Sequence, residues 1–429
     1  MALVAMLAVL VAATLMGFPV GLALFGSGIL YFLVSGQDAS YAGELVLHGL
    51  LASFVLLAVP LFIFAAQVMN AGSISDRLLQ FALALVGRFR GGLAQVNVLT
   101  SLIFASMSGS ATADAAGIGR VEISMMTAKQ RYPPGFAAAV TVASATIGPI
   151  FPPSIIMVFY AIVSSTSIGA LFLAGVVPGV LMTVVLMIAV AIIARRRDYP
   201  VEPDVAAGVY LYVLLRALLP LLMPVLLFGG IYSGAFTPTE AAGVAGLYAL
   251  CLSALVYREL SLGALFRTLV ETVRTTAMIT SVFFGAFVFS YILTIERIPN
   301  VVAAVLQASD TSPILFLLMT NVILLLLGAF VETTAIILVL VPLLLPTILT
   351  LGIDPVHFGI VVTLNLTIGL ITPPYGMILF VVSAVNNIPI RDILRETWVF
   401  IIGLIIALFI VTYVPEISLF LPRWFGFVR

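Results

Sequence analysis

The sequence predicts an all-α polytopic membrane protein. Of its 429 residues, 63% are hydrophobic and only 8% are charged, whereas a soluble domain has roughly a quarter charged residues. A helix needs about 20 apolar residues to cross the bilayer core, so this chain has room for about nine to twelve crossings. Its long apolar runs do not alternate polar and apolar residues, and they therefore favour helices over the strands of a membrane barrel.

Charge and cysteine content exclude several other classes of protein. Lysine plus arginine equals aspartate plus glutamate at 18 each, so the chain offers no basic surface and we expect no nucleic-acid partner. A single cysteine, Cys251, excludes disulfide frameworks and cysteine metal clusters. The opening segment 1–16 has no basic region before its apolar stretch, so we expect a retained helix in contact with membrane lipid rather than a cleaved signal peptide.

Nine apolar runs are long enough to be full membrane spans, with boundaries that are soft by several residues. The first run contains Gly17, Phe18 and Pro19, which are compatible either with a kink in one tilted span or with a turn between two short helices. Both alternatives stay open at this point. The runs are 3–34, 45–69, 136–162, 168–194, 211–231, 239–257, 275–295, 358–385 and 398–414.

Two further apolar segments are each broken near the middle by small polar residues. Segment 93–128 is broken at 106–112, and segment 313–349 is broken at 328–334. Arms of about 15 residues rise only about 22 Å at 1.5 Å per residue, which is short of the roughly 30 Å hydrocarbon core. Each segment is therefore predicted to be a re-entrant hairpin.

The basic residues predict which side each hairpin enters from, because cytoplasmic loops are enriched in lysine and arginine. Basic residues flank both ends of the first hairpin, whereas Asp310 and Asp354 flank the second, so the two hairpins enter from opposite faces. The number of predicted crossings between the two hairpins also places them on opposite faces. The resulting topology puts 14 of the 18 basic residues on the cytoplasmic side and predicts an outward-facing C-terminus. Segments 72–92 and 257–275 mix charged and apolar residues and are expected to be interfacial helices.

A repeated motif relates the two halves of the chain. Residues 146–153 read Thr-Ile-Gly-Pro-Ile-Phe-Pro-Pro and residues 367–374 read Thr-Ile-Gly-Leu-Ile-Thr-Pro-Pro, an offset of 221 (367 minus 146). The same offset places Thr112 of the first hairpin on Thr333 of the second. Either motif alone could be a simple kink. The matched pair, in opposite orientations, indicates the inverted repeat of a secondary transporter.

The paired prolines point to a cation site in each half. Proline removes a backbone donor and frees a carbonyl one turn upstream, which in hydrocarbon needs another partner, and a cation is a natural one. Hydroxyls at the hairpin tips add oxygen ligands, although helix packing is the commoner role for any single serine. The candidate cation ligands are Ser106, Ser110, Gly148, Pro152, Gly328, Glu332, Thr333, Gly369 and Thr372, and the candidate substrate contacts are Ser108, Thr112, Pro152, Thr333 and Pro373.

Acidic residues at membrane depth are costly and commonly functional. Asp114 and Glu332 lie at or near the two tips, where each could ligate a cation or cap the following helix, and both alternatives stay open. Glu122 and Arg120 lie two residues apart, a spacing that does not place them on one helix face, so no ion pair is predicted. Glu240 follows an ordinary helix-start signal.

The repeat divides the chain into five predicted parts. Hairpins and interrupted helices are expected to move together while the remaining spans stay fixed, as in an elevator-type transporter. The parts are 1–92 (N-terminal scaffold helices and an interfacial helix), 93–194 (first repeat), 195–312 (scaffold helices and an interfacial helix), 313–414 (second repeat) and 415–429 (C-terminal tail).

Four motifs give the chain a resemblance to a known family. They are Gly-Phe-Pro-Val at 17–20, Ser-Gly-Ser-Ala-Thr-Ala-Asp at 108–114, Gly-Pro-Ile-Phe-Pro-Pro-Ser at 148–154 and Thr-Pro-Pro-Tyr-Gly at 372–376. With them, essentially the whole chain resembles the large membrane subunit, DctM type, of tripartite ATP-independent periplasmic (TRAP) transporters. Segment 119–122, Gly-Arg-Val-Glu, departs from the more apolar return arm expected after the first tip.

The resemblance implies sodium-driven uptake of a small organic anion, such as a dicarboxylate or a sialic acid, across the bacterial inner membrane. It implies that Na⁺ occupies the cation sites and that the chain is not an enzyme. Two partners are expected: a small four-helix membrane subunit of DctQ type and a periplasmic substrate-binding protein of DctP type. The alternatives are a stand-alone sodium/dicarboxylate or anion exchanger and, remotely, an intramembrane protease that uses Asp114 and Glu332 as a carboxyl pair.

Overall fold

The computed structural model describes residues 1–52, 54–70, 74–202, 207–308 and 311–428, and every regular element within them is a helix. Six helices in this part of the chain are long and apolar enough to cross a membrane alone, or seven if one bent pair counts as a span. The number is below the nine predicted spans because several predicted spans are divided into shorter helices. The all-α membrane fold is confirmed.

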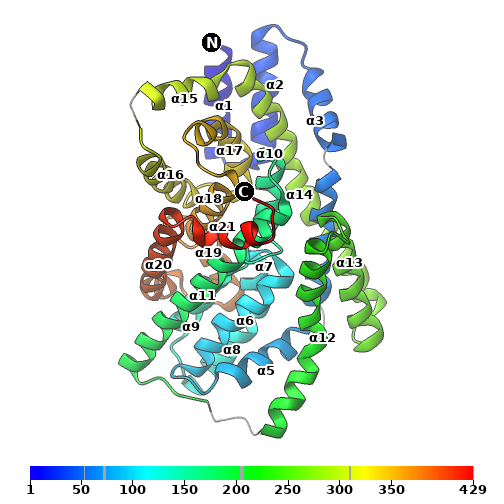
Figure 1. Cartoon of the computed structure of the whole chain (residues 1–429), viewed down its shortest axis with the longest axis vertical. Helices are drawn as coiled ribbons and strands as arrows, with labels where there is room; N and C mark the ends of the chain where they lie inside the picture. The colour runs from blue at the N-terminus through cyan, green and yellow to red at the C-terminus, as the bar shows by residue number, and fades with distance from the viewer. Residues whose placement is uncertain (53, 71–73, 203–206, 309–310, 429) are drawn as a thin grey trace.

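The first apolar run forms two helices that pack against each other, α1 (Ala2–Leu15) and α2 (Val20–Ser35). The chain turns at Gly17, whose φ of +84° favours a residue without a Cβ atom. Pro19 then caps the start of α2. Of the two alternatives left open by the sequence, the turn is the one present, and Figure 1 shows the two helices side by side.

The predicted span 45–69 is bent rather than straight, because two helices occupy it. α3 (Tyr41–Ala52) and α4 (Ala58–Asn70) are bent relative to each other, with a short 3₁₀ turn at Phe54–Leu57 between them. Pro60 explains the break, since it has no N–H to bond the carbonyl one turn earlier and so favours a helix start there. The interfacial helix predicted at 72–92 corresponds to the amphipathic helix α5 (Ile74–Val86), and residues 71–73 lie outside the described residues.

The first hairpin is present and is followed by an interrupted helix. Its return arm is divided at Gly117, whose φ of −83° and ψ of −97° are not helical. Beyond the second half of the interrupted helix, a 30-residue span leads to the three arginines at 195–197. The elements are α6 (Gly92–Ser108), α7 (Ala111–Ala116), α8 (Ile118–Thr127), α9 (Pro134–Ser144) with a 3₁₀ turn (Ala145–Ile147), α10 (Ile155–Ser164) and α11 (Ile168–Arg197).

Three long helices follow, α12 (Ala207–Tyr232), α13 (Pro238–Cys251) and α14 (Leu262–Ile295). The separate interfacial helix predicted at 257–275 is wrong, because α14 runs without interruption for 34 residues. It contains no proline, and oppositely charged residues three and four apart, from Arg267 to Arg274, support a continuous helix. Two elements were not predicted, a π-helical turn that extends α13 (Leu252–Val256) and the amphipathic helix α15 (Ile298–Ala308).

The second half repeats the first with the opposite orientation. In Figure 1 the first hairpin lies in the lower half of the molecule and the second in the upper half, so the two approach its middle from opposite ends. The second hairpin is also followed by an interrupted helix. The elements are α16 (Pro313–Gly328), α17 (Thr333–Thr350), α18 (Pro355–Gly369), α19 (Met377–Asn386), α20 (Ile390–Tyr413) and α21 (Glu416–Trp424).

Buried hydrogen bonds join each hairpin to its interrupted helix. In the first repeat the Ser144 hydroxyl on α9 donates to Asn97 Oδ1 on α6 at 2.8 Å. In the second the Asn365 amide on α18 donates to Asn321 Oδ1 on α16 at 2.7 Å. Ser144 and Asn365 are related by the offset of 221, whereas their partners Asn97 and Asn321 are 224 residues apart (321 minus 97), so the two halves use similar but not equivalent bonds.

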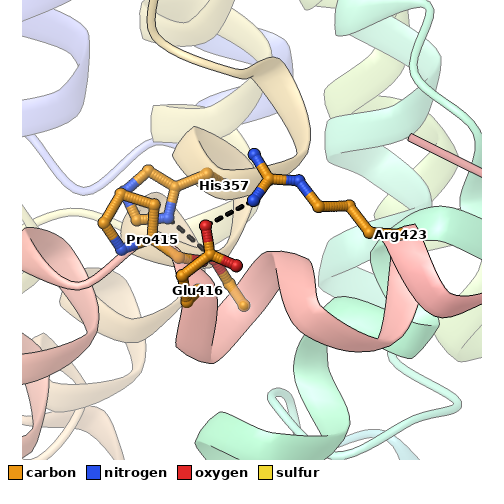
Figure 2. Close-up of polar contacts among 5 residues, drawn as sticks. His357, Pro415, Glu416 and Arg423 are labelled. Carbon is orange, nitrogen blue, oxygen red and sulfur yellow. Dashed lines mark hydrogen bonds and ion pairs between the residues drawn. The ribbon is translucent and has the colours of Figure 1, made fainter. Parts of the chain in front are cut away.

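The C-terminal helix α21 packs against α11 and α18. The ring of His357 on α18 lies 2.8 Å from the Ser418 hydroxyl and 3.2 Å from the Thr412 carbonyl oxygen. Figure 2 shows this histidine next to Pro415, with the ion pair between Glu416 and Arg423 on α21 beside it. These contacts fix the tail to the second repeat.

Candidate functional site

Both hairpin tips line one cavity near the middle of the molecule. Its volume is about 510 Å³, and its walls come from the two tips, from the starts of α10 and α19, and from α4 and α14 on the side of the scaffold. Figure 1 shows α7, α10 and α19 meeting at this height. The predicted site residues that line it are Ser108, Ser110 and Thr112 from the first tip and Glu332 and Thr333 from the second.

The first tip is held against the break in the first interrupted helix. Gly109 has a φ of +62°, and a Cβ atom there would lie only 2.4 Å from the Pro153 carbonyl oxygen. No other residue fits such a close approach. The peptide bond between Pro152 and Pro153 is cis, and the Ser154 hydroxyl donates to the Pro149 carbonyl within the break.

Asp114 lies buried behind this tip and does not cap its helix. Ser110 is the cap of α7, accepting a hydrogen bond from the Ala113 N–H. The Ser108 hydroxyl donates to Asp114 Oδ1, while Oδ2 has no hydrogen-bond partner in the described part of the chain. A Cβ atom on Gly148 would lie 2.6 Å from this Oδ2, so the free oxygen faces the break.

The Gly148 carbonyl is a second oxygen without a donor. In a continuous helix it would bond the N–H of residue 152, but Pro152 has none. No hydrogen bond from any described residue reaches this carbonyl. A carbonyl without a donor and a buried carboxyl oxygen without a partner at the same helix break fit a monovalent cation, since unwound carbonyls in discontinuous transporter helices coordinate Na⁺.

The second tip also rests on the break of its own interrupted helix. A Cβ atom on Gly369 would lie 2.6 Å from the Gly328 carbonyl carbon, so the two glycine backbones are in direct contact. The Tyr375 N–H donates to the Ala329 carbonyl at 3.2 Å. Glu332 caps α17 with Oε2, which accepts from the Ala335 N–H at 3.1 Å. Of the two alternatives for Glu332, capping is therefore the one observed.

The remaining predicted residues differ in where they lie. The Thr333 hydroxyl is buried at the cavity and has no partner within the described residues. Thr372 donates to the Ile368 carbonyl at 2.7 Å, and Ser106 donates to the Ile103 carbonyl in its own helix. Neither side chain lines the cavity. Gly148, Pro152, Gly328, Gly369 and Pro373 belong to the tip-and-break contacts next to the cavity rather than to its wall.

The charge of the cavity wall is one-sided. Glu332 is an acid, and no lysine or arginine occurs among the described residues that line the cavity. Gln67 and Asn70 on α4 and Thr275 on α14 add polar groups from the scaffold. The sequence analysis missed these three residues because no motif or repeat marks them. In the described residues no three histidine, cysteine or acidic side chains are grouped to hold a metal ion.

The inverted repeat, with two hairpin tips meeting at a central cavity, defines a membrane transporter of the secondary type. A family model, the DctM component of the tripartite ATP-independent periplasmic transporters, matches residues 6–417, and the chain therefore belongs to this family. The resemblance drawn from the motifs is confirmed. The chain is a multi-pass permease of the bacterial inner membrane and not an enzyme, so the protease alternative is wrong.

Named relatives cover nearly the whole chain. It is 43% identical over 410 residues to the sialic acid TRAP transporter large permease protein SiaM of Vibrio cholerae, covering 95% of this chain and 96% of that protein. It is 42% identical to the C4-dicarboxylate TRAP transporter large permease protein DctM of Pseudomonas aeruginosa, covering 93% of each. The crystal structure of the Alcanivorax borkumensis YdaH transporter shares the fold, with a TM-score of 0.60 at 17% identity over 90% of this chain and 88% of that one.

Proposed function

We propose that this permease imports a small organic anion by sodium-coupled elevator transport, with a periplasmic binding protein delivering the substrate. The observation that supports this most directly is the pair of partnerless oxygens at the first break, Asp114 Oδ2 and the Gly148 carbonyl, next to a cavity shared by both tips. A buried anionic oxygen without a donor is costly unless a cation offsets it.

Each half would hold one Na⁺ between its tip and its break. In the first half the hydroxyls of Ser108 and Ser110 and the carbonyls of Gly148 and Pro152 would supply oxygen ligands, with Asp114 offsetting the charge. In the second half the ligands would come from the Thr333 and Thr372 hydroxyls and from the backbone at Gly328 and Gly369. Bound sodium supplies positive charge at both ends of the cavity.

The anion would bind in the cavity between the two cations. The start of α17, an 18-residue helix, contributes the positive end of its dipole there. Hydroxyls of Thr112 and Thr333, which line the cavity, would donate to a carboxylate, and Pro152 and Pro373 would shape the breaks on either side. Relatives are named as transporters of sialic acid and of C4-dicarboxylates, which supports a carboxylate as the substrate class.

Transport would require the two repeats, 93–194 and 313–414, to move as one body against the scaffold. The cavity lies between the tips and the scaffold helices α4 and α14, where such a motion would carry it across the membrane. A DctQ-type small subunit would bind the scaffold, and a DctP-type binding protein would dock on the periplasmic face. Family membership supports both partners.

The test is substrate uptake into proteoliposomes that contain this chain with its small partner subunit. Labelled carboxylates would be screened with and without a sodium gradient and with and without loaded binding protein. We expect uptake only when both are present. Uptake by the large chain alone, indifferent to the binding protein, would instead support the stand-alone exchanger.

A further inference from the structure

Glu122 is a buried acid that the proposed sodium sites do not use. It lies on α8, the return arm of the first hairpin, and only 3% of its surface is exposed. Neither carboxyl oxygen has a hydrogen-bond partner within the described residues. α8 packs against α6 and α9, whose facing surfaces carry a cluster of buried polar side chains. Glu122 thus meets polar neighbours without being bonded to them.

The neighbouring donors are already committed to other acceptors. The Asn97 amide donates to Thr141 Oγ1 at 2.7 Å and to Met126 Sδ at 3.9 Å. The Ser101 hydroxyl donates to Ser144 Oγ at 2.9 Å, and the Ser144 hydroxyl donates to Asn97 Oδ1 at 2.8 Å. An ionised carboxylate can only accept hydrogen bonds, so this cluster has nothing to offer it.

The threonines of the cluster are committed in the same way. Thr141 donates to the Ala137 carbonyl at 3.1 Å. Thr100 donates its one hydroxyl hydrogen to the Val96 carbonyl at 2.7 Å. Both hydroxyl hydrogens are therefore used within the helices, and neither is free for a carboxylate.

No positive charge in the described residues compensates Glu122. α6, α9 and α19, which pack against α8, contain no titratable side chain. α7, which also packs against α8, contributes Asp114, an acid rather than a base. Arg120 and Lys129, which are near Glu122 in the chain, are exposed. Two uncompensated negative charges at this depth would be very costly.

We propose that Glu122 is a proton-binding site: its buried carboxyl group carries a proton through the transport cycle. The proton neutralises Glu122, so no further cation is needed to offset its charge. Asp114 then carries the one negative charge of the first hairpin. A cavity of about 750 Å³ beside α8, lined by Arg120, Ile123 and Ser124, gives solvent a route to the residue next to Glu122. The consequence for the number of sodium ions bound rests on the proposed function. The protonation of Glu122 does not depend on that function.

The direct test is infrared spectroscopy of the full-length chain in lipid nanodiscs with Na⁺ present. The carbonyl stretch of a protonated carboxylic acid is expected in the unaltered protein at neutral pH, with a shift in D₂O. Glu122→Gln should remove it, while Glu240→Gln, which alters an exposed carboxylate, should leave it unchanged. A band that persists in Glu122→Gln would overturn the proposal. Glu122→Leu provides a second variant without a charge, should the glutamine variant fail to fold.

A second test separates a bound proton from a bound cation. Because Gln has the shape and the neutral charge of the protonated acid, Glu122→Gln should keep the sodium concentration for half-maximal uptake within about twofold of the unaltered protein. If Glu122 instead ligated a cation as a carboxylate, that concentration should rise by about tenfold or more, which would overturn the proposal. If uptake by the unaltered chain shows no sodium dependence, the proposed function fails. The infrared result then still decides whether Glu122 carries a proton.

Discussion

The contact between the two glycines at the second tip makes a sharp prediction for Gly369→Ala. The added Cβ would lie 2.6 Å from the Gly328 carbonyl carbon and 2.7 Å from its Cα. Ordinary contact begins at 3.4 Å, so the tip and the break must separate by about 0.8 Å. Backbone atoms on both sides leave no flexible side chain to absorb this. Overpacking of this kind costs about 1–3 kcal/mol, and metal ligands tolerate displacements of only about 0.2 Å.

We therefore expect Gly369→Ala to raise the sodium concentration for half-maximal uptake by about 5- to 150-fold. Gly328→Ala is the matched control from the other side of the same contact, because its Cβ would lie 3.3 Å from the Gly369 Cα and so fits with a small adjustment. Proteoliposome uptake over a range of sodium concentrations measures both variants, and size-exclusion chromatography checks folding. Equal effects of the two alanines, or an unchanged sodium dependence in Gly369→Ala, would refute the reasoning.

The other predictions concern single side chains. Thr333→Ala removes a buried hydroxyl without a partner, so thermal stability should hold while uptake falls, as measured by scanning fluorimetry and uptake side by side. Ser108→Ala removes the donor to Asp114 and should weaken apparent sodium affinity about tenfold, whereas Ser106→Ala, whose hydroxyl bonds its own helix, should change it less than threefold. At the start of α13 the Thr237 N–H donates to Glu240 Oε2 at 2.8 Å and the Glu240 N–H donates to the Thr237 hydroxyl at 3.3 Å, so the two residues cap this helix reciprocally. Thr237→Ala should lower the melting temperature by no more than about 2 °C in thermal unfolding scans.

The hairpins and the interrupted helices could be predicted because their signals are local. Paired prolines forbid a continuous helix across them, and a short stretch of small and polar residues in an apolar run marks a tip. The prolines in α17 show the limit of this rule, since Pro342 and Pro346 lie inside a helix that continues past them. What distinguishes them is that they are not adjacent, so each frees only one carbonyl.

The cavity wall on the scaffold side could not be predicted, because it depends on which helix faces which. Gln67 and Asn70 lie about two hundred residues before Thr275 in the sequence and share no motif with it, yet all three line one cavity. Gly328 and Gly369 were interpreted as cation ligands, and the structure adds a packing role that their sequence context conceals. The division of the predicted span 45–69 depended on a single proline near its middle, a weaker signal than the proline pairs.

The absence of lysine and arginine from the described cavity wall has a consequence for the order of events. In the proposed sodium-coupled cycle the bound cations supply most of the attraction for the anion, so the substrate should enter last from outside and leave first once the external sodium concentration no longer holds the ions there. Such a carrier would resist running in reverse with substrate alone, because the anion by itself would meet Glu332 and no lysine or arginine among the described residues of the wall. The sodium gradient would then set the inward direction of net transport. The affinity of the cavity wall for the anion would not set it.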